Sequence, residues 1–365
     1  MELTKQENQM AKGVAILAMV MLHLFCRLGD LPYTPLIWIG HTPLIYYLGL
    51  FGDICVPIYC FCSGYAQILL KGREQSQYRR SRWVRLFKFL LNYWIVLVLF
   101  SIVGALFDKT GAIPGSVRIF LGNLFLYSLS YNGAWWFVLT YAFLIALSPL
   151  FIRAAEKMRP IPLFLVSGAL YFVSYIFRFA YPLHFEVALF QWAWEQFLLI
   201  GTSQFSFVLG MLFYQHKVIS KLRARLNQLG GRIWNNHPYI YIYILPAALF
   251  LVHCVIKSLI IAPITGILTL TCFYLWDKPL WAKKLFSFFG KHSTNIWLVH
   301  MFYYLVLFPN LVFAAKYPIP ILALMLMLSV VTSYLINWIY QPIVSKLLCA
   351  AQHRFENFTR SRRRP

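Results

Sequence analysis

The sequence has few charged residues and very few acidic ones. Only 12% of its 365 residues are charged, and 11 Asp and Glu residues stand against 33 Lys and Arg residues. A soluble domain of this length would carry about twice that charged fraction. The chain is 60% hydrophobic, and many separate apolar runs approach the length that crosses a bilayer. The composition therefore argues against a soluble globular protein and predicts an all-α, polytopic membrane protein.

Cysteine patterns typical of metal sites or disulfide frameworks are absent from the sequence. Of the seven cysteines, six fall within apolar runs, and none forms a C-x-x-C pair with a matching set of His or Cys residues. A cysteine inside such a run behaves as a small apolar residue. We therefore expect neither a bound metal nor disulfide bonds.

The net charge of +22 raises the question of nucleic-acid binding, but its distribution predicts membrane topology instead. If the N-terminus is cytoplasmic and about ten helices span the membrane, all but six of the Lys and Arg residues lie at the cytoplasmic side. The exceptions are Arg27, Lys109, Arg118, Arg178, Lys257 and Lys316. This asymmetry is the positive-inside rule. We expect both termini in the cytoplasm, a multi-pass protein of the cytoplasmic membrane, and no nucleic-acid partner.

The hydrophobic pattern predicts ten membrane spans. They cover about 11–28, 44–70, 86–107, 134–152, 161–180, 193–214, 238–256, 259–276, 293–309 and 319–343. The apolar run 119–131 is too short to cross and is expected to form a re-entrant or interfacial helix on the outer side. No repeat or linker divides the chain, so we expect a single domain over 1–365 with a basic tail from about 346.

The first span carries a charged stripe on an apolar helix. At 100° per residue, His23 lies about 20° around the helix from Lys12, and Arg27 follows one turn later, so all three share one face. Ionisable groups inside a membrane normally face a bundle interior or a watery cavity. A neutral imidazole there can take a proton from a hydroxyl group, as acyl or phosphoryl transfer requires. The alternative is an inert histidine that is hydrogen-bonded to a neighbouring helix.

The second span contains a carboxylate and residues that interrupt helices. Gly52, Pro57 and Gly64 predict a kink or break where the helix lines a cavity. Asp53 lies in the outer half of this span, and His23 lies at a similar depth in the preceding antiparallel span. Asp53 is therefore a candidate to orient His23, and we predict both as catalytic residues.

Four arginines follow the second span at its cytoplasmic end: Arg79, Arg80, Arg82 and Arg85. Guanidinium groups pair bidentately with phosphate, so this cluster is a candidate clamp for a phosphorylated cofactor. The alternative is that the cluster marks topology and contacts lipid headgroups. The spacing does not separate the two.

Other motifs have simpler structural interpretations. Ser63-Gly64 lacks the G-x-S-x-G frame of a nucleophile elbow and is more typical of helix packing in a membrane. His300 and Ser293 lie on nearly the same face of their predicted helix. The simpler interpretation is that His300 is a packing residue. Trp135 and Trp136 are typical of an interfacial aromatic anchor, with a sugar-stacking platform as the alternative.

The ordered set of these motifs resembles acyltransferase family 3, a family of integral membrane proteins of which many O-acetylate extracytoplasmic carbohydrates. The resemblance rests on K-G-V-A-I-L-A-M-V-M-L-H, then G-D-I-C-V-P-I-Y-C-F-C-S-G-Y and an Arg-rich loop, and later W-W-F-V-L-T-Y-A-F-L-I-A-L-S-P-L and F-G-K-H-S-T-N-I-W-L-V-H. It implies that His23 is the essential histidine of the first helix. Lys12 stands where the family usually has Arg. Thr140 and Tyr141 stand in a span where some members carry Glu.

The resemblance implies an O-acyltransferase of a bacterial cytoplasmic membrane. It would transfer an acetyl group from cytoplasmic acetyl-CoA, held by Lys12 and the arginine cluster, to a hydroxyl of a surface polysaccharide or its lipid-linked precursor. The alternative is a proton-coupled transporter or flippase that uses Lys12, His23 and Asp53 as a relay. Transporters often contain interrupted helices in two related halves, and only one interrupted span is visible in this sequence. The oligomeric state is not predicted.

Overall fold

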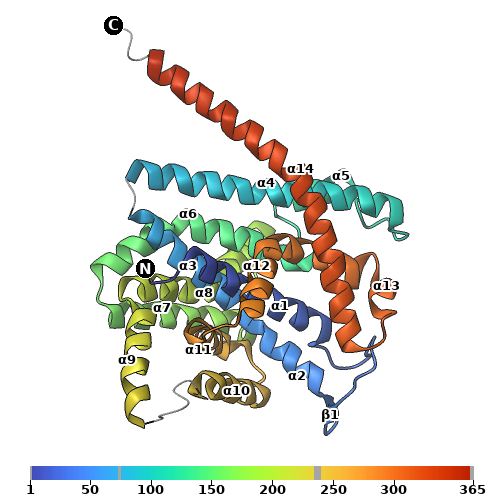
Figure 1. The fold of residues 1–365 in the computed structure, drawn as a ribbon. Helices are drawn as coiled ribbons and strands as arrows, with labels where there is room; N and C mark the ends of the chain where they lie inside the picture. The colour runs from blue at the N-terminus through green and yellow to red at the C-terminus, as the bar shows by residue number, and fades with distance from the viewer. Residues whose placement is uncertain (1, 73–74, 234–239, 362–365) are drawn as a thin grey trace.

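The computed structural model describes residues 2–72, 75–233 and 240–361 and shows a bundle of helices (Figure 1). Within these residues, seven helices are long and apolar enough to cross a membrane: Lys5–Phe25, Leu44–Lys71, Tyr78–Phe107, Gly133–Lys157, Pro160–Ala180, Ala188–Gln215 and Pro318–Leu347. Two shorter apolar helices cover Ile242–Val255 and Leu259–Leu275. The predicted all-α, polytopic membrane architecture is confirmed.

Helix α1 (Lys5–Phe25) begins and ends earlier than predicted. It begins early because Thr4 and Glu7 form a capping box, in which Thr4 Oγ1 accepts from the Glu7 amide at 3.1 Å. It ends at Phe25 because Cys26 leaves the helical conformation. The expectation that Arg27 continues the charged stripe is therefore wrong. Arg27 lies beyond the helix, where Nη2 donates to the carbonyl oxygen of His23 at 3.2 Å.

The second span breaks close to its predicted position. Helix α2 (Leu44–Phe51) passes into a 3₁₀ turn, η1 (Gly52–Ile54), and then into α3 (Cys55–Lys71). Asp53 is part of the turn. The break thus places a carboxylate at an interruption of the helix, while Gly64 packs against Phe207 of α8 (Ala188–Gln215) as the packing interpretation predicts.

The middle of the chain continues the bundle. Helix α4 (Gln75–Phe107) begins eleven residues before the predicted span, so the arginine cluster lies on a helix and not in a loop. Helix α5 (Val117–Leu124) has only eight residues and cannot cross a bilayer. The next elements are η2 (Gly133–Trp135), α6 (Trp136–Lys157), α7 (Pro160–Tyr175), a π-helical turn η3 (Ile176–Ala180), α8 and α9 (Val218–Ile233).

The last third begins with α10 (Ile240–Val255), η4 (Leu259–Ile261) and α11 (Ala262–Leu275). It continues with α12 (Leu280–Met301), a π-helical turn η5 (Phe302–Val306), α13 (Pro309–Phe313) and α14 (Pro318–Ser361). Helix α14 runs well past the predicted span, so the predicted basic tail is helical as far as Ser361. A two-residue antiparallel pair, β1 (Trp38–Ile39) with β2 (Thr42–Pro43), lies in the loop after α1.

Helices α1 and α12 form the centre of the bundle. They approach so closely that a Cβ atom added at Gly290 would lie 1.9 Å from the carbonyl oxygen of Gln9, and one added at Gly13 would lie 2.1 Å from that of Phe286. Only glycine allows backbones to come this near. A buried polar chain also joins α4, α12 and α14, because Asn92 donates to Asn295 at 2.7 Å and Asn295 donates to Ser333 at 3.0 Å.

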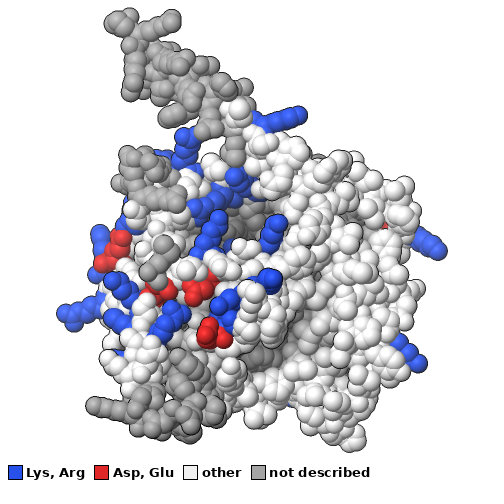
Figure 2. Space-filling model, viewed as in Figure 1, with Lys and Arg blue, Asp and Glu red and all other residues white. Residues whose placement is uncertain are grey.

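Basic side chains gather at one end of the bundle. Figure 2 shows Lys and Arg concentrated on the half of this face that holds the N-terminus and α9, and few at the end that holds β1 and α13. The face is hollowed between α14 and the N-terminus, with Lys and Arg around the hollow. This distribution agrees with the positive-inside prediction of a cytoplasmic N-terminus.

Candidate active site

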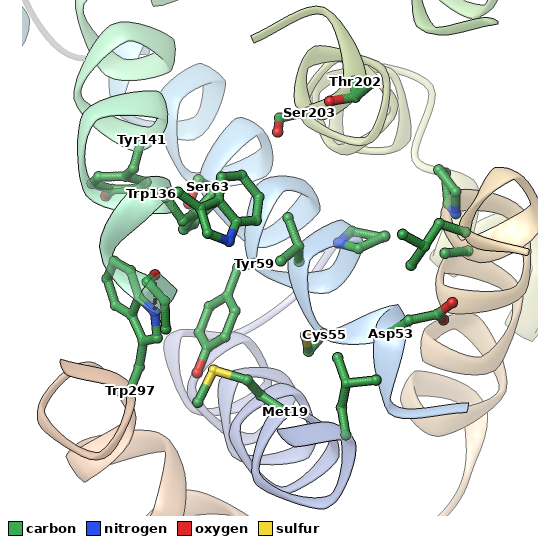
Figure 3. A pocket seen from close by; sticks show the side chains of 18 of the residues that line it. Met19, Asp53, Cys55, Tyr59, Ser63, Trp136, Tyr141, Thr202, Ser203 and Trp297 are labelled. Carbon is green, nitrogen blue, oxygen red and sulfur yellow. Dashed lines mark hydrogen bonds between the residues drawn. The ribbon is translucent and has the colours of Figure 1, made fainter. Parts of the chain in front are cut away.

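A cavity of about 1480 Å³, open solvent at its mouth included, lies between the central helices. Figure 3 shows side chains from several helices turned toward it. Its wall combines aromatic residues with a few polar groups, as small-molecule sites generally do. The polar lining residues are Lys12, His23, Asp53, Tyr59, Ser63, Tyr141, Tyr171, Tyr175, Arg178, Thr202, Ser203, Ser293 and Thr294.

His23 lies in the wall of this cavity and is hydrogen-bonded to a second histidine. Its Nδ1 is 2.5 Å from Nε2 of His300 on α12, and the two rings are stacked with centroids 4.8 Å apart. His300 is itself buried, with 1% of its surface exposed, and does not line the cavity. The close packing of α1 on α12 thus positions the ring that faces the cavity.

The partner of His300 determines where the protons lie. His300 Nδ1 is 2.7 Å from the carbonyl oxygen of Trp297, and because a carbonyl can only accept, Nδ1 must carry the proton. Nε2 of a neutral His300 is then an acceptor, so Nδ1 of His23 donates to it. This arrangement leaves Nε2 of His23 as an unprotonated acceptor. A general base requires such a nitrogen.

Lys12 lines the same cavity, about three helical turns before His23 on α1. The predicted charged stripe is therefore present in part, since Lys12 and His23 line one cavity. Among the residues that the structure describes, no carboxylate forms a salt bridge with Lys12. Arg27 instead contributes to a separate hollow, where its guanidinium group lies over the rings of Tyr304 and Phe313 at 5.6 and 5.9 Å.

Asp53 also lines the cavity, but its hydrogen-bond partner is not His23. Asp53 Oδ2 is 2.9 Å from Nε2 of His253 on α10, and both side chains are buried. In Figure 3, Asp53 lies across the cavity from Trp297 and Tyr141. The structure therefore does not show the expected orientation of His23 by Asp53, since His300 occupies Nδ1 of His23. A catalytic role for Asp53 stays a prediction.

The arginine cluster lies outside the cavity wall, at the start of α4. Arg79 and Arg80 are exposed, and Arg85 donates to Ser81 at 3.1 Å. Arg82 differs from them because only 8% of its surface is exposed. Its guanidinium group lies 4.9 Å from the centre of the Trp83 ring, and Nε and Nη1 have no hydrogen-bond partner among the described residues.

The remaining candidates divide between the cavity and the core. Ser63 and Trp136 line the cavity, so the anchor interpretation of Trp136 is incomplete. Trp135 is fully buried and donates to the carbonyl oxygen of Leu298 at 3.0 Å. His253 and Arg178 were not predicted as site residues from the sequence, and His300 was predicted as a packing residue without its contact to His23. Within residues 2–72, 75–233 and 240–361, no group of three His, Cys, Asp or Glu side chains could hold a metal ion.

A family model described as an acyltransferase domain matches residues 9–338. The chain belongs to acyltransferase family 3. Searches of curated proteins and of solved structures found no match. The matched range begins in α1 and ends in α14, so it contains every element that lines the cavity. Lys12 and Tyr141, where the sequence was expected to differ from the family pattern, both line the cavity.

Proposed function

We propose that this acyltransferase is an O-acetyltransferase of a bacterial cytoplasmic membrane. It would move the acetyl group of cytoplasmic acetyl-CoA to a hydroxyl group of a surface polysaccharide or of its lipid-linked precursor. Family membership supports acyl transfer over the transporter alternative. The observation that carries the proposal is His23 in the wall of a cavity within the bundle, with Nδ1 bound to His300 and Nε2 left as an acceptor.

In the proposed step, Nε2 of His23 takes the proton of the acceptor hydroxyl while its oxygen attacks the thioester carbonyl. A new C–O ester bond forms, the C–S bond breaks, and the proton passes from His23 to the thiolate of the departing CoA. The hydrogen bond from Nδ1 to His300 holds the imidazole in the required tautomer throughout. Such a positioned base contributes roughly 10²- to 10⁴-fold to a rate.

The basic end of the bundle supports the predicted acetyl-CoA site. Lys12 faces the cavity from the first turns of α1, and Arg82 has two buried nitrogens that still need acceptors. Phosphate oxygens are strong acceptors that guanidinium groups bind bidentately. Basic side chains around the hollow in Figure 2 would also raise the local concentration of an anionic donor. We assign the phosphates of acetyl-CoA to this end.

The test compares surface polysaccharide from cells that carry the wild-type protein or His23→Ala, using NMR to measure O-acetyl content. We expect His23→Ala to lower acetylation at least roughly 100-fold, since the base is lost while the protein still accumulates in the membrane. His41→Ala, an exposed histidine in the loop between β1 and β2, is the matched control and should acetylate normally. Normal acetylation by His23→Ala would refute the mechanism.

A second measurement tests the donor site through the release of CoA from acetyl-CoA by isolated membranes. Arg82→Gln should raise the KM for acetyl-CoA by roughly tenfold or more, because a charge-assisted hydrogen bond is lost. Arg159→Gln removes an exposed arginine at the start of α7 and should leave KM unchanged. Equal KM values for both variants would show that the arginine cluster marks topology and does not bind acetyl-CoA.

A further inference from the structure

A second cation faces the cavity, far along the chain from Lys12. Arg178 lies in the π-helical turn η3 at the end of α7, and it lines the cavity together with Trp136, Phe179 and Thr202. Its guanidinium group is 5.3 Å from the centre of the Trp136 ring and 4.9 Å from that of Phe179. Nη1 donates to Thr202 Oγ1 at 3.2 Å.

The positive charge of Arg178 is not balanced by a carboxylate in the part of the chain that the structure describes. None of the salt bridges found there involves Arg178. Asp53, the one carboxylate that the described residues contribute to the cavity wall, is bound to His253. Aromatic rings attract a guanidinium group but do not neutralise it. A charge that is partly removed from water and left without a counter-ion favours a ligand that brings one.

The position of Arg178 separates this charge from the predicted donor site. Helix α7 begins near the basic segment Arg153–Arg159, at the predicted cytoplasmic side, so η3 lies at its opposite end. Lys12 and the arginine cluster lie at the cytoplasmic side. Arg178 is one of the six basic residues predicted on the outer side. The cavity thus has one cation toward each predicted side, and His23 lies in the wall of the same cavity.

We propose that Arg178 forms an acceptor subsite for an anionic sugar, one that carries a carboxylate or a phosphate ester. This inference rests on the proposed function, since it names the acceptor class of the same cavity. The guanidinium fork would pair with the anionic group. The flat rings of Trp136, Tyr175 and Phe179 supply apolar surface for the sugar ring, and Thr202 and Ser203 supply hydroxyl groups.

Binding tests the subsite without requiring catalysis. The purified full-length protein in detergent is titrated with methyl glucuronide, glucose 1-phosphate and methyl glucoside, and thermal stabilisation gives each Kd. We expect at least one anionic sugar to bind at least tenfold more tightly than the neutral methyl glucoside. Comparing methyl glucuronide with glucose 1-phosphate shows whether the site prefers a carboxylate or a phosphate ester. Equal binding of all three sugars would overturn the proposal.

Two variants test whether Arg178 itself binds the anionic group of the sugar. Arg178→Gln should weaken binding of the preferred anionic sugar by roughly 10- to 100-fold, the usual loss for a hydrogen bond to a charged group. Its affinity for methyl glucoside should not change. Arg118→Gln removes an exposed arginine on α5, also predicted on the outer side, and should bind like the wild type. A loss shared by neutral and anionic sugars would make Arg178 a structural residue and refute the subsite.

The subsite and the proposed function can fail separately. If the wild-type protein binds an anionic sugar through Arg178 but no polysaccharide is acetylated, the subsite stands and acyl transfer to a glycan fails. If polysaccharide is acetylated and Arg178→Gln leaves both binding and acetylation unchanged, the function stands and the subsite fails.

Discussion

Among single side chains, His300 has the most direct influence on the candidate chemistry. Its Nε2 accepts a hydrogen bond from Nδ1 of His23 only because the carbonyl oxygen of Trp297 holds the proton of His300 on Nδ1. A base whose proton sits on the wrong nitrogen loses up to roughly 10⁴-fold in rate, even when its geometry is intact. We therefore regard His300 as a positioning residue.

This role predicts different effects for two substitutions. His300→Leu removes the acceptor and should lower kcat at least about tenfold while the KM for acetyl-CoA stays the same. His300→Gln keeps an oxygen that can accept from Nδ1 of His23 and should recover part of that loss. Steady-state release of CoA by isolated membranes gives both constants. If Leu and Gln at this position have equal kcat values, His300 acts only through packing.

The two histidines also show what the sequence could and could not predict about single residues. His23 was predicted because an ionisable group in an apolar helix is rare and costly. Its partner was not, since His23 and His300 are 277 positions apart and only the packing of α1 on α12 brings them together. The same reason explains Asp53, for which a similar depth in consecutive antiparallel spans suggested His23 as partner although α10 supplies His253.

Among the helices, the contact between α1 and α12 is the one on which the site depends. The backbone of α12 at Gly290 lies against that of α1 at Gln9, ten residues before His300. An added methyl group at this contact forces the two helices apart, and overpacking of this kind typically costs about 1–3 kcal/mol. The distance between His23 and His300 would change with it.

Gly290→Ala should therefore lower both the melting temperature of the purified protein and the rate of CoA release. Gly168→Ala on α7 is the matched control, because its Cβ would meet Phe205 at 3.5 Å, an ordinary contact, and alanine favours a helix. We expect Gly168→Ala to be as stable as the wild type or more so. A stable and fully active Gly290→Ala would show that the two helices can separate without disturbing the site.

The hydrophobic pattern predicted where helices occur better than where they end. The break at Gly52 and the short α5 follow from local residues, since glycine weakens a helix and eight residues cannot span a bilayer. The early starts of α1 and α4 do not, because polar and charged residues can continue a helix beyond the apolar region that marks it. Hydropathy therefore marks the part of a helix that lies inside the bilayer and not the full length of the helix.

For the bundle as a whole, the proposed reaction requires one orientation. Acetyl-CoA can reach Lys12 from the cytoplasm only if the N-terminus is cytoplasmic, and an outer acceptor can reach Arg178 only if the far end of α7 is outside. The basic residues around the N-terminus and α9 favour this orientation. The opposite orientation would place the donor site outside the cell, where the proposed mechanism has no acyl-CoA.

Cysteine labelling tests this orientation in intact cells. The background is Cys349→Ser, which removes the one exposed native cysteine in the described chain. Lys109→Cys and Arg118→Cys should react with a membrane-impermeant maleimide in intact cells, whereas Lys221→Cys and Lys284→Cys should react only after permeabilisation. All four positions are exposed, so differences in labelling report the side of the membrane and not burial. Labelling of Lys221→Cys in intact cells would show that the cavity has the opposite orientation in the membrane. The assignment of Lys12 to the donor and Arg178 to the acceptor would then be wrong.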